Sequence, residues 1–186
     1  MNSLYELHKA TAADFTTLVE GVEDWDAPSP VKEWNTRGIV EHLVTWLPAL
    51  LKQADVELPE GPDAASDPVG AWKNQTAAVD ELLLDEDALA RQIQMPGMTK
   101  TVAEIIAEFY EPDVFMHTWD LARASDQDFI LDEARCDAMY KGMSQNEEML
   151  RASGQFGERV DVLLSATAED HLMGFIGRDP YWTPDN

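Results

Sequence analysis

The sequence predicts an all-α protein: an up-and-down four-helix bundle followed by extra short C-terminal helices and an irregular tail. Apolar residues recur three and four positions apart over four long stretches, a spacing that places them on one face of an α-helix. Capping residues and loops rich in proline or glycine separate these stretches. The 186 residues, 45% of them hydrophobic, suffice for one core, so we expect a single domain over residues 1–186.

The first two long helices begin at recognisable start signals. Residues 3–6, Ser-Leu-Tyr-Glu, have the form of a capping box, and the apolar spacing after them predicts a helix over residues 4–23. A proline-rich loop follows. Asn35 is a suitable N-cap for the second helix, whose apolar stripe directs His42 inward and whose Pro48 predicts a kink or a local break.

The third helix is preceded by a long loop and followed by a turn. Residues 55–68 are rich in Pro, Gly, Asp and Ser, which predicts a connection that crosses the bundle. Asp67, with proline after it, predicts the start of a helix that runs to about Leu84. Residues 91–97 alternate weakly and end in Pro-Gly, a pattern typical of a short extended piece or hairpin.

The fourth helix opens at a second capping box, Thr-Val-Ala-Glu at residues 101–104. Its stripe begins purely apolar and continues with two carboxylates and a histidine. Pro112 removes a backbone donor within this run, so we expect a kink just before the charged residues. The stripe consists of Val102, Ile105, Ile106, Phe109, Asp113, Met116, His117, Asp120, Leu121 and Ala124.

Beyond the fourth helix the pattern becomes shorter and less regular. Asp132 predicts the N-cap of a fifth helix that extends to about Met149, and residues 160–162 have the composition of an extended piece. A short last helix is predicted from Thr167 to Gly177, which is suited to the position after a helix end.

Charge and cysteine content restrict the class of function. The 36 acidic and 13 basic residues give a formal charge of −23, which repels nucleic acid and anionic lipid alike, so neither is expected as a partner. The sequence has no membrane span or secretory signal, and we expect a cytoplasmic protein. Because Cys136 is the single cysteine, any metal must be held by histidine and carboxylate.

Three residues form a candidate metal site. Asp113 and His117 are four residues apart and therefore lie on one face of a helix, and His42 on the second helix could complete the set. Two nitrogens and one oxygen suit Zn²⁺, Ni²⁺, Fe²⁺ or Mn²⁺, and three protein ligands leave room for water or substrate. The alternative is a metal-free core in which these residues are hydrogen-bonded to one another.

Other polar or aromatic residues have two interpretations each. Trp46 and Arg123 are the candidates for cofactor contacts; the alternatives are ordinary core for the tryptophan and an ion pair for the arginine. Arg178 likewise either clamps an acidic substrate or pairs with a carboxylate. For His8 we expect core packing, with a fourth metal ligand as the alternative, and for His171 a surface position.

Several short blocks together resemble a known family. They are Trp34 followed by His42-Leu43, a His-Thr-Trp-Asp-Leu-Ala-Arg-Ala block at 117–124, Gly-Gln-Phe-Gly at 154–157, and Gly-Phe-Ile-Gly-Arg-Asp-Pro at 174–180. This combination resembles the actinobacterial maleylpyruvate isomerase N-terminal-like family, which belongs to the DinB-like metal-binding four-helix bundles. The resemblance spans nearly the whole chain.

The resemblance implies a divalent metal, often zinc, held by His42, Asp113 and His117. It also implies a low-molecular-weight thiol such as mycothiol, activated by the metal for S-transfer to, or isomerisation of, a small molecule. The alternative is a non-catalytic metal- or ligand-binding bundle that acts in a stress response or in interactions. Oligomers such as a homodimer are common among such bundles.

Two departures from the family separate this chain from its named reaction. The isomerase uses Glu where this chain has Asp113, a shorter ligand that requires a closer helix, and Pro112 could supply that shift. The isomerase also carries a second, C-terminal domain, whereas this chain ends at Asn186. We therefore do not expect maleylpyruvate isomerisation.

Overall fold

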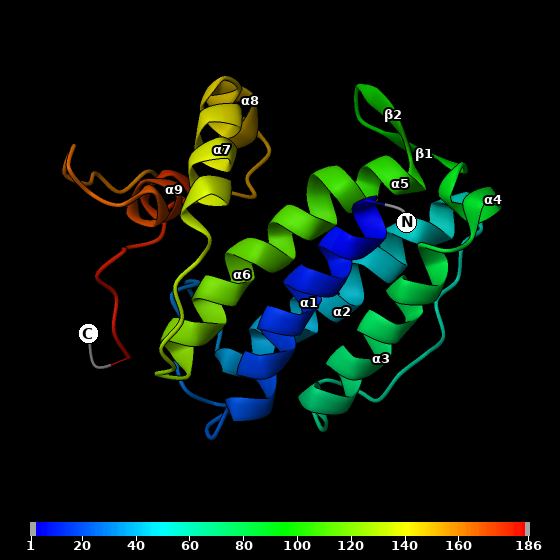
Figure 1. The fold of residues 1–186 in the computed structure, drawn as a ribbon, viewed down its shortest axis with the longest axis horizontal. Coiled ribbons are helices and arrows are strands. Elements are labelled where there is room, and N and C mark those ends of the chain that lie inside the picture. Colours follow the sequence, from blue (N-terminus) through cyan, green and yellow to red (C-terminus); the bar gives the residue numbers. More distant parts are fainter. Residues whose placement is uncertain (1–2, 185–186) are drawn as a thin grey trace.

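The computed structural model describes residues 3–184, and these are mostly helical (Figure 1). Four of the longer helices share one core: α1 (Ser3–Gly21), α2 (Thr36–Leu51), α3 (Pro68–Leu82) and α6 (Glu111–Ala124). Helix α1 packs against α3 and α6, and α2 packs against the same two helices. Within the described part, no helix combines the length and apolar character needed to cross a membrane.

The path of the chain differs from a simple up-and-down order, because α2 and α3 run in the same direction (Figure 1). The loop over residues 55–67 returns along the length of these helices before α3 begins. Near the start of α2, the Arg37 guanidinium donates to the Ala65 carbonyl at 2.8 Å. The Asn74 amide of α3 donates to the Pro59 carbonyl at 2.9 Å. The predicted crossing loop is confirmed. The predicted up-and-down order, in which successive helices alternate in direction, is wrong.

The predicted start signals of the inner helices are confirmed. The Asn35 side chain accepts from the N–H of Gly38 at 2.9 Å, and Asp67 accepts from the N–H of Gly70 at 2.8 Å. Helix α2 includes Pro48 and stays helical to Leu51. The capping box expected at residues 3–6 adjoins residues 1–2, which lie outside the described part.

The fourth predicted helix is divided into three segments, with a π-helical turn at the place where a kink was expected. Helix α5 (Val102–Ile105) is followed by a π-helical turn (Ile106–Tyr110) and then by α6. The N–H of Glu111 donates to the carbonyl of Ile106, five residues back. Pro112 comes next and has no N–H with which to continue an α-helical ladder. The wider turn inserts one residue, which changes the facing of all later residues by about 100°.

A short hairpin precedes this divided helix. Strands β1 (Gln92–Met95) and β2 (Met98–Thr101) are antiparallel, and Gly97 in the turn has a φ of 78°, which favours glycine. The hairpin and the Thr101 capping box are both as predicted. A one-turn helix, α4 (Glu86–Leu89), connects α3 to β1.

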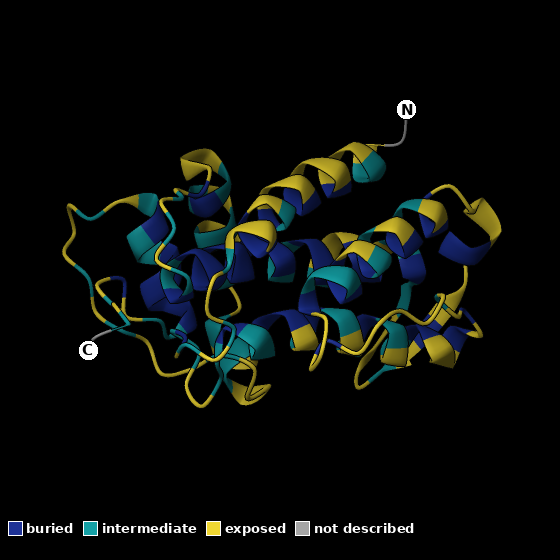
Figure 2. Ribbon diagram, turned by 90° about the horizontal axis from the view of Figure 1, so that it is seen from below, coloured by how far each residue is buried: buried dark blue, intermediate teal, exposed yellow. Residues whose placement is uncertain are grey.

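The C-terminal helices form a second core against the other side of α6. They are α7 (Glu133–Ser144), α8 (Glu147–Ala152) and α9 (Ala168–Ile176). The single fifth helix predicted to reach residue 149 is wrong, because the chain turns between α7 and α8. Residues 160–162 form no strand in the structure. Helix α6 is consequently buried on almost every side, while outer helices such as α1 keep an exposed face (Figure 2).

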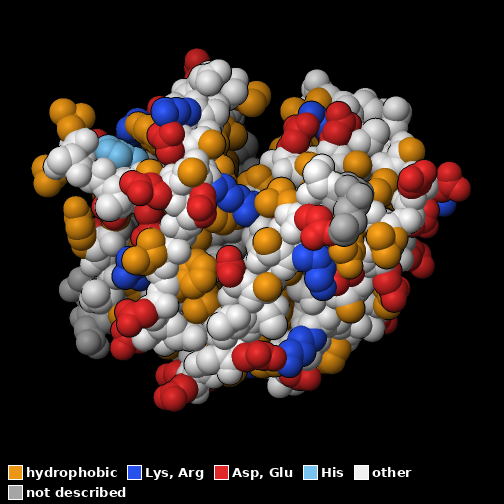
Figure 3. Space-filling model, in the orientation of Figure 1, with side chains coloured by type: hydrophobic (Ala, Val, Ile, Leu, Met, Phe, Trp, Pro, Cys, Tyr) orange, Lys and Arg blue, Asp and Glu red, His pale blue; other side chains and the backbone are white. Residues whose placement is uncertain are grey.

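The surface reflects the composition. Acidic side chains are spread over the whole face shown in Figure 3, with fewer basic ones between them and hydrophobic side chains scattered among both. On this face the negative charge is therefore distributed and does not form a single patch.

Candidate metal centre

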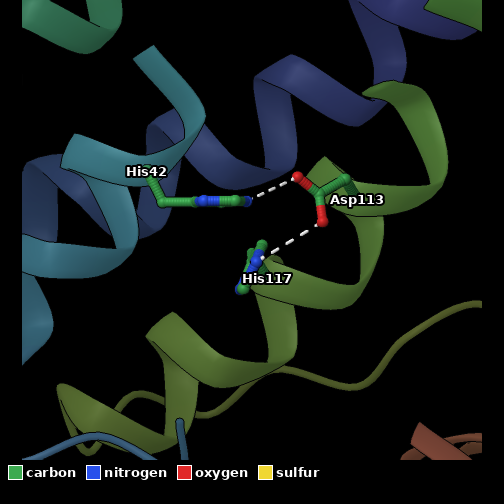
Figure 4. Close-up of side chains that lie close together, drawn as sticks. All are labelled: His42, Asp113 and His117. Atoms are coloured by element: carbon green, nitrogen blue, oxygen red, sulfur yellow. Dashed lines mark hydrogen bonds and ion pairs between the residues drawn. The ribbon is translucent and has the colours of Figure 1, made fainter. Parts of the chain in front are cut away.

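The three predicted ligands meet where α2 packs against α6 (Figure 4). Nε2 of His42 lies 2.9 Å from Oδ2 of Asp113, and Nε2 of His117 lies 3.5 Å from Oδ1 of the same carboxylate. One ligand atom from each residue lies within 4.8 Å of the other two. Residues from two helices thus form one group that could hold a metal ion.

Behind His117 stands a second carboxylate, which sets the orientation of its ring. Nδ1 of His117 lies 2.8 Å from Oδ2 of Asp120, and both side chains are buried. Arg178 donates to both oxygens of Asp120, from Nε at 2.8 Å and from a terminal nitrogen at 3.0 Å. In its neutral form, a histidine that donates its Nδ1 proton to a carboxylate presents a lone pair at Nε2, the arrangement found around many metal-bound histidines.

Two tryptophans enclose the group. The indole N–H of Trp46 donates to Oδ2 of Asp113 at 2.8 Å, so this cofactor-contact candidate lies directly at the site. Trp34 packs against both imidazoles, with ring centroids 4.9 Å from His42 and 5.7 Å from His117. The preceding residue, Glu33, has a φ of 68°, which is strained for a residue with a side chain.

The sequence pattern did not place Trp34 at the site, and for Arg178 it left pairing with a carboxylate as one of two alternatives without naming the partner. Both lie outside the helical stripes, Trp34 in the loop before α2 and Arg178 after α9. Their positions follow from the path of the loops, for which periodicity gives no signal. Asp120 was foreseeable as a partner of His117, since a spacing of three residues places both on one helix face.

The opposite charges of the carboxylates, His117 and Arg178 stabilise one another. Burial would raise the pKa of the Asp113 carboxyl, but the charge of His117 and the contact with His42 hold this pKa below its usual value. Burial also opposes the charge of His117, yet the carboxylates of Asp113 and Asp120 raise its pKa. Burial acts against Asp120 in the same way, and the Arg178 guanidinium lowers that pKa. Both carboxylates are therefore ionised at neutral pH.

A solvent-open cavity of about 600 Å³ adjoins the group on the side of His42. Its lining contains two glutamates and, among the described residues, no lysine or arginine. It therefore favours neutral or cationic ligands over anionic ones. The lining residues are Glu33, Trp34, Asn35, Gly38, Glu41, His42 and Thr45.

Comparison with known proteins yields distant relatives that align over nearly their whole length. No family model matches this chain. Two uncharacterized proteins of Mycobacterium tuberculosis, Rv0738 of strain H37Rv and MT0763 of strain CDC 1551, are each 23% identical to it over 177 residues. The alignment covers 92% of this chain and 95% of each relative. No solved structure matches. The relatives extend the comparison over nearly the whole chain and carry no description of function.

The two arginines singled out in the sequence both pair with carboxylates. Arg178 binds Asp120 behind the metal ligands, as described above. A terminal nitrogen of Arg123 lies 3.6 Å from Oε1 of Glu169 on α9, and its guanidinium lies 5.3 Å from the centre of the Trp119 ring. Arg123 is thus outside the three-ligand group, and its contact with a cofactor stays a prediction.

The remaining histidines also lie outside the group. His8 is buried in the core, as expected, and its Nδ1 is 2.7 Å from Oε1 of Glu111. The described residues that converge as ligands are three and do not include His8. His171 is partly exposed and stacks on Tyr140, with ring centroids 5.7 Å apart.

Proposed function

We propose that His42, Asp113 and His117 bind a divalent metal, most suitably zinc, with nickel, iron and manganese as alternatives. The observation that carries this proposal is the contact between Asp120 and His117. It fixes the His117 ring so that Nε2 faces the other two ligands, a support that metal-bound histidines commonly have. Two imidazoles and one carboxylate are ligands that suit these cations.

We further propose that the protein is a metal-dependent enzyme that uses a low-molecular-weight thiol such as mycothiol for S-transfer or isomerisation of a small molecule. A dication at this position would lower the pKa of a bound thiol and supply a thiolate at neutral pH. The protein's own residues orient the metal ligands and shield them from solvent. Trp46 holds Asp113 by a hydrogen bond, and Trp34 covers the two imidazoles.

The cavity beside His42 favours this function over a purely structural metal site. A structural site closes its coordination with four protein ligands, whereas three ligands next to an open cavity leave room for a ligand from solution. The alternative, a non-catalytic metal- or ligand-binding protein, predicts a metal that takes up no thiol. The proposal includes a DinB-like bundle for α1, α2, α3 and α6, a cytoplasmic setting with reduced thiols, and association as a homodimer.

Metal analysis tests the site. We expect purified wild-type protein to carry about one equivalent of metal and the His117→Ala variant to carry almost none. His171→Ala is the matched control, because this histidine lies on α9 away from the ligands, and it should retain the metal. If the wild type and His117→Ala hold the same sub-stoichiometric amount, the site is wrong.

A thermal-shift series tests the thiol separately. Metal-loaded protein is heated with mycothiol, bacillithiol or glutathione. A thiol at about 100 times its dissociation constant should stabilise the fold by roughly 2.7 kcal/mol. If none of the three raises the melting temperature while the metal stays bound, the thiol reaction is left without support and the non-catalytic alternative is favoured.

A further inference from the structure

A second polar cluster lies inside the helices, apart from the three metal ligands. His8 of α1, Gln75 of α3, Tyr110 of the π-helical turn and Glu111 of α6 are each at least 96% buried. Asp80 of α3 closes the cluster toward the surface, with its side chain 23% exposed. Three helices and the π turn thus contribute polar groups to one interior region.

Only part of the hydrogen-bonding capacity of this cluster is used. His8 Nδ1 pairs with Glu111 Oε1 at 2.7 Å, and Lys9 donates to Oδ2 of Asp80 at 3.0 Å. Buried polar atoms are nearly always paired in proteins. Here five of them have no hydrogen-bond partner among residues 3–184: His8 Nε2, Gln75 Nε2, Asp80 Oδ1, Tyr110 OH and Glu111 Oε2.

Four of the unpaired atoms belong to two neighbouring pairs, His8 with Asp80 and Gln75 with Tyr110. His8 Nε2 and Asp80 Oδ1 are 4.0 Å apart, too far for a direct hydrogen bond. Burial raises the pKa of Tyr110, and the nearby amide of Gln75 acts to lower it, although the two groups do not reach hydrogen-bonding geometry. The 4.0 Å between His8 and Asp80 is a separation that a third group could bridge.

The chemistry of the five atoms identifies that group. Gln75 Nε2 and the Tyr110 hydroxyl are donors, Asp80 Oδ1 and Glu111 Oε2 are acceptors, and the His8 ring nitrogen can be either. The two carboxylates exclude an anion, and the amide donor disfavours a metal ion. We propose that ordered water molecules bind here, because water donates and accepts at once and commonly satisfies such groups in protein interiors.

One residue of the cluster also borders a solvent-open groove. Gln75 also lines a solvent-open groove of about 730 Å³ between α2, α3 and the loop over residues 57–64. Near the cluster lies Trp46, whose ring is 5.8 Å from that of Tyr110 and whose N–H binds Asp113. Trp46 thus contacts both Tyr110 of this cluster and Asp113 of the metal ligands.

Water-to-protein NOE measurements on the wild type decide the proposal. Bound water should give cross-peaks to the protons of the Tyr110 ring and hydroxyl. Their sign should be the one that long-lived water contacts produce. Their absence would overturn the inference and indicate that His8 and Asp80 close directly on each other.

The Tyr110→Phe variant supplies a second measurement. Loss of a water-bound hydroxyl should lower the melting temperature by about 2–4 °C and remove the remaining water cross-peaks at this ring. Tyr181→Phe, at an exposed tyrosine, should leave the melting temperature unchanged. An unchanged or raised melting temperature in Tyr110→Phe would also contradict the proposal.

Discussion

Arg178, Asp120 and His117 form a chain of contacts in which each residue fixes the next. The guanidinium binds the carboxylate twice, and the carboxylate holds the imidazole. The effect of Arg178 on a metal ligand is therefore indirect, through the orientation of one ring. Removing the middle group should leave the ligands in place but free His117 to rotate.

We predict that Asp120→Asn lowers metal affinity by about 10- to 100-fold, because partners behind a metal ligand typically contribute that much. The affinity is measured by competition with a chromophoric chelator. Asp161→Asn serves as the control, since Asp161 is exposed and distant in sequence from the ligands. Equal affinity in Asp120→Asn and wild type would mean that the carboxylate does not support the ring.

Cys136 is predicted to be unreactive in the native protein. Burial raises the pKa of this thiol to about 12, so roughly one thiol in ten thousand is ionised at pH 8. A disulfide reagent at pH 8 should label it slowly in buffer and stoichiometrically in denaturant. Fast labelling of the native protein would show that the thiol is accessible and ionised.

At the scale of elements, α2 depends on its first turn to present His42. The Asn35 side chain caps this helix and also lines the cavity. Asn35→Ala should reduce the free energy of unfolding by about 1 kcal/mol, since the cap hydrogen bond is lost. Asn35→Asp should retain the stability, because a carboxylate accepts the same bond. Urea titrations of the three proteins measure the difference, and equal losses in both variants would rule out capping as its cause.

Local signals allowed much of the element order to be predicted. Asn35, Asp67 and Thr101 begin helices because each has a side-chain oxygen at the position that needs one, and the Pro-Gly pair closes the hairpin. The π-helical turn before α6 gave no such signal beyond Pro112. Its form depends on packing, because α6 must fit two cores at once and a shift of one residue redirects Asp113 and His117.

The candidate site likewise combines features that local sequence patterns predict with features that depend on tertiary packing. The spacing of Asp113 and His117 on one helix, and the inward stripe that carries His42, indicated that the three residues could converge, and the family resemblance favoured a metal there. The direction of α3 and the positions of Trp34 and Arg178 were not predictable in this way, because they depend on how loops return across the molecule. Periodicity describes a helix face and contains no information on where a loop ends.

For the whole molecule, the charge of −23 should affect which ligands reach the cavity. Glu41 lines it, and one charge at a distance of roughly 10 Å changes binding about twofold in water. Glu41→Gln should improve binding of an anionic thiol such as mercaptosuccinate relative to neutral 2-mercaptoethanol, measured by absorption of Co²⁺-loaded protein. The advantage should disappear at about 1 M salt. Glu81→Gln, exposed on α3, is the control, and an equal effect there would contradict a local role.

Helix α6 lies between two cores, and this position has a thermodynamic consequence. Phe115, Met116 and Trp119 pack against the C-terminal helices, while His117 on the same helix belongs to the ligand group and is tied to Arg178 through Asp120. Opening of the α7–α9 region would remove Arg178 and expose the apolar face of α6. By linkage, a metal ion that binds the ordered imidazole of His117 more tightly must also stabilise the closed form of the C-terminal region. Metal occupancy and the resistance of this region to proteases should therefore rise together.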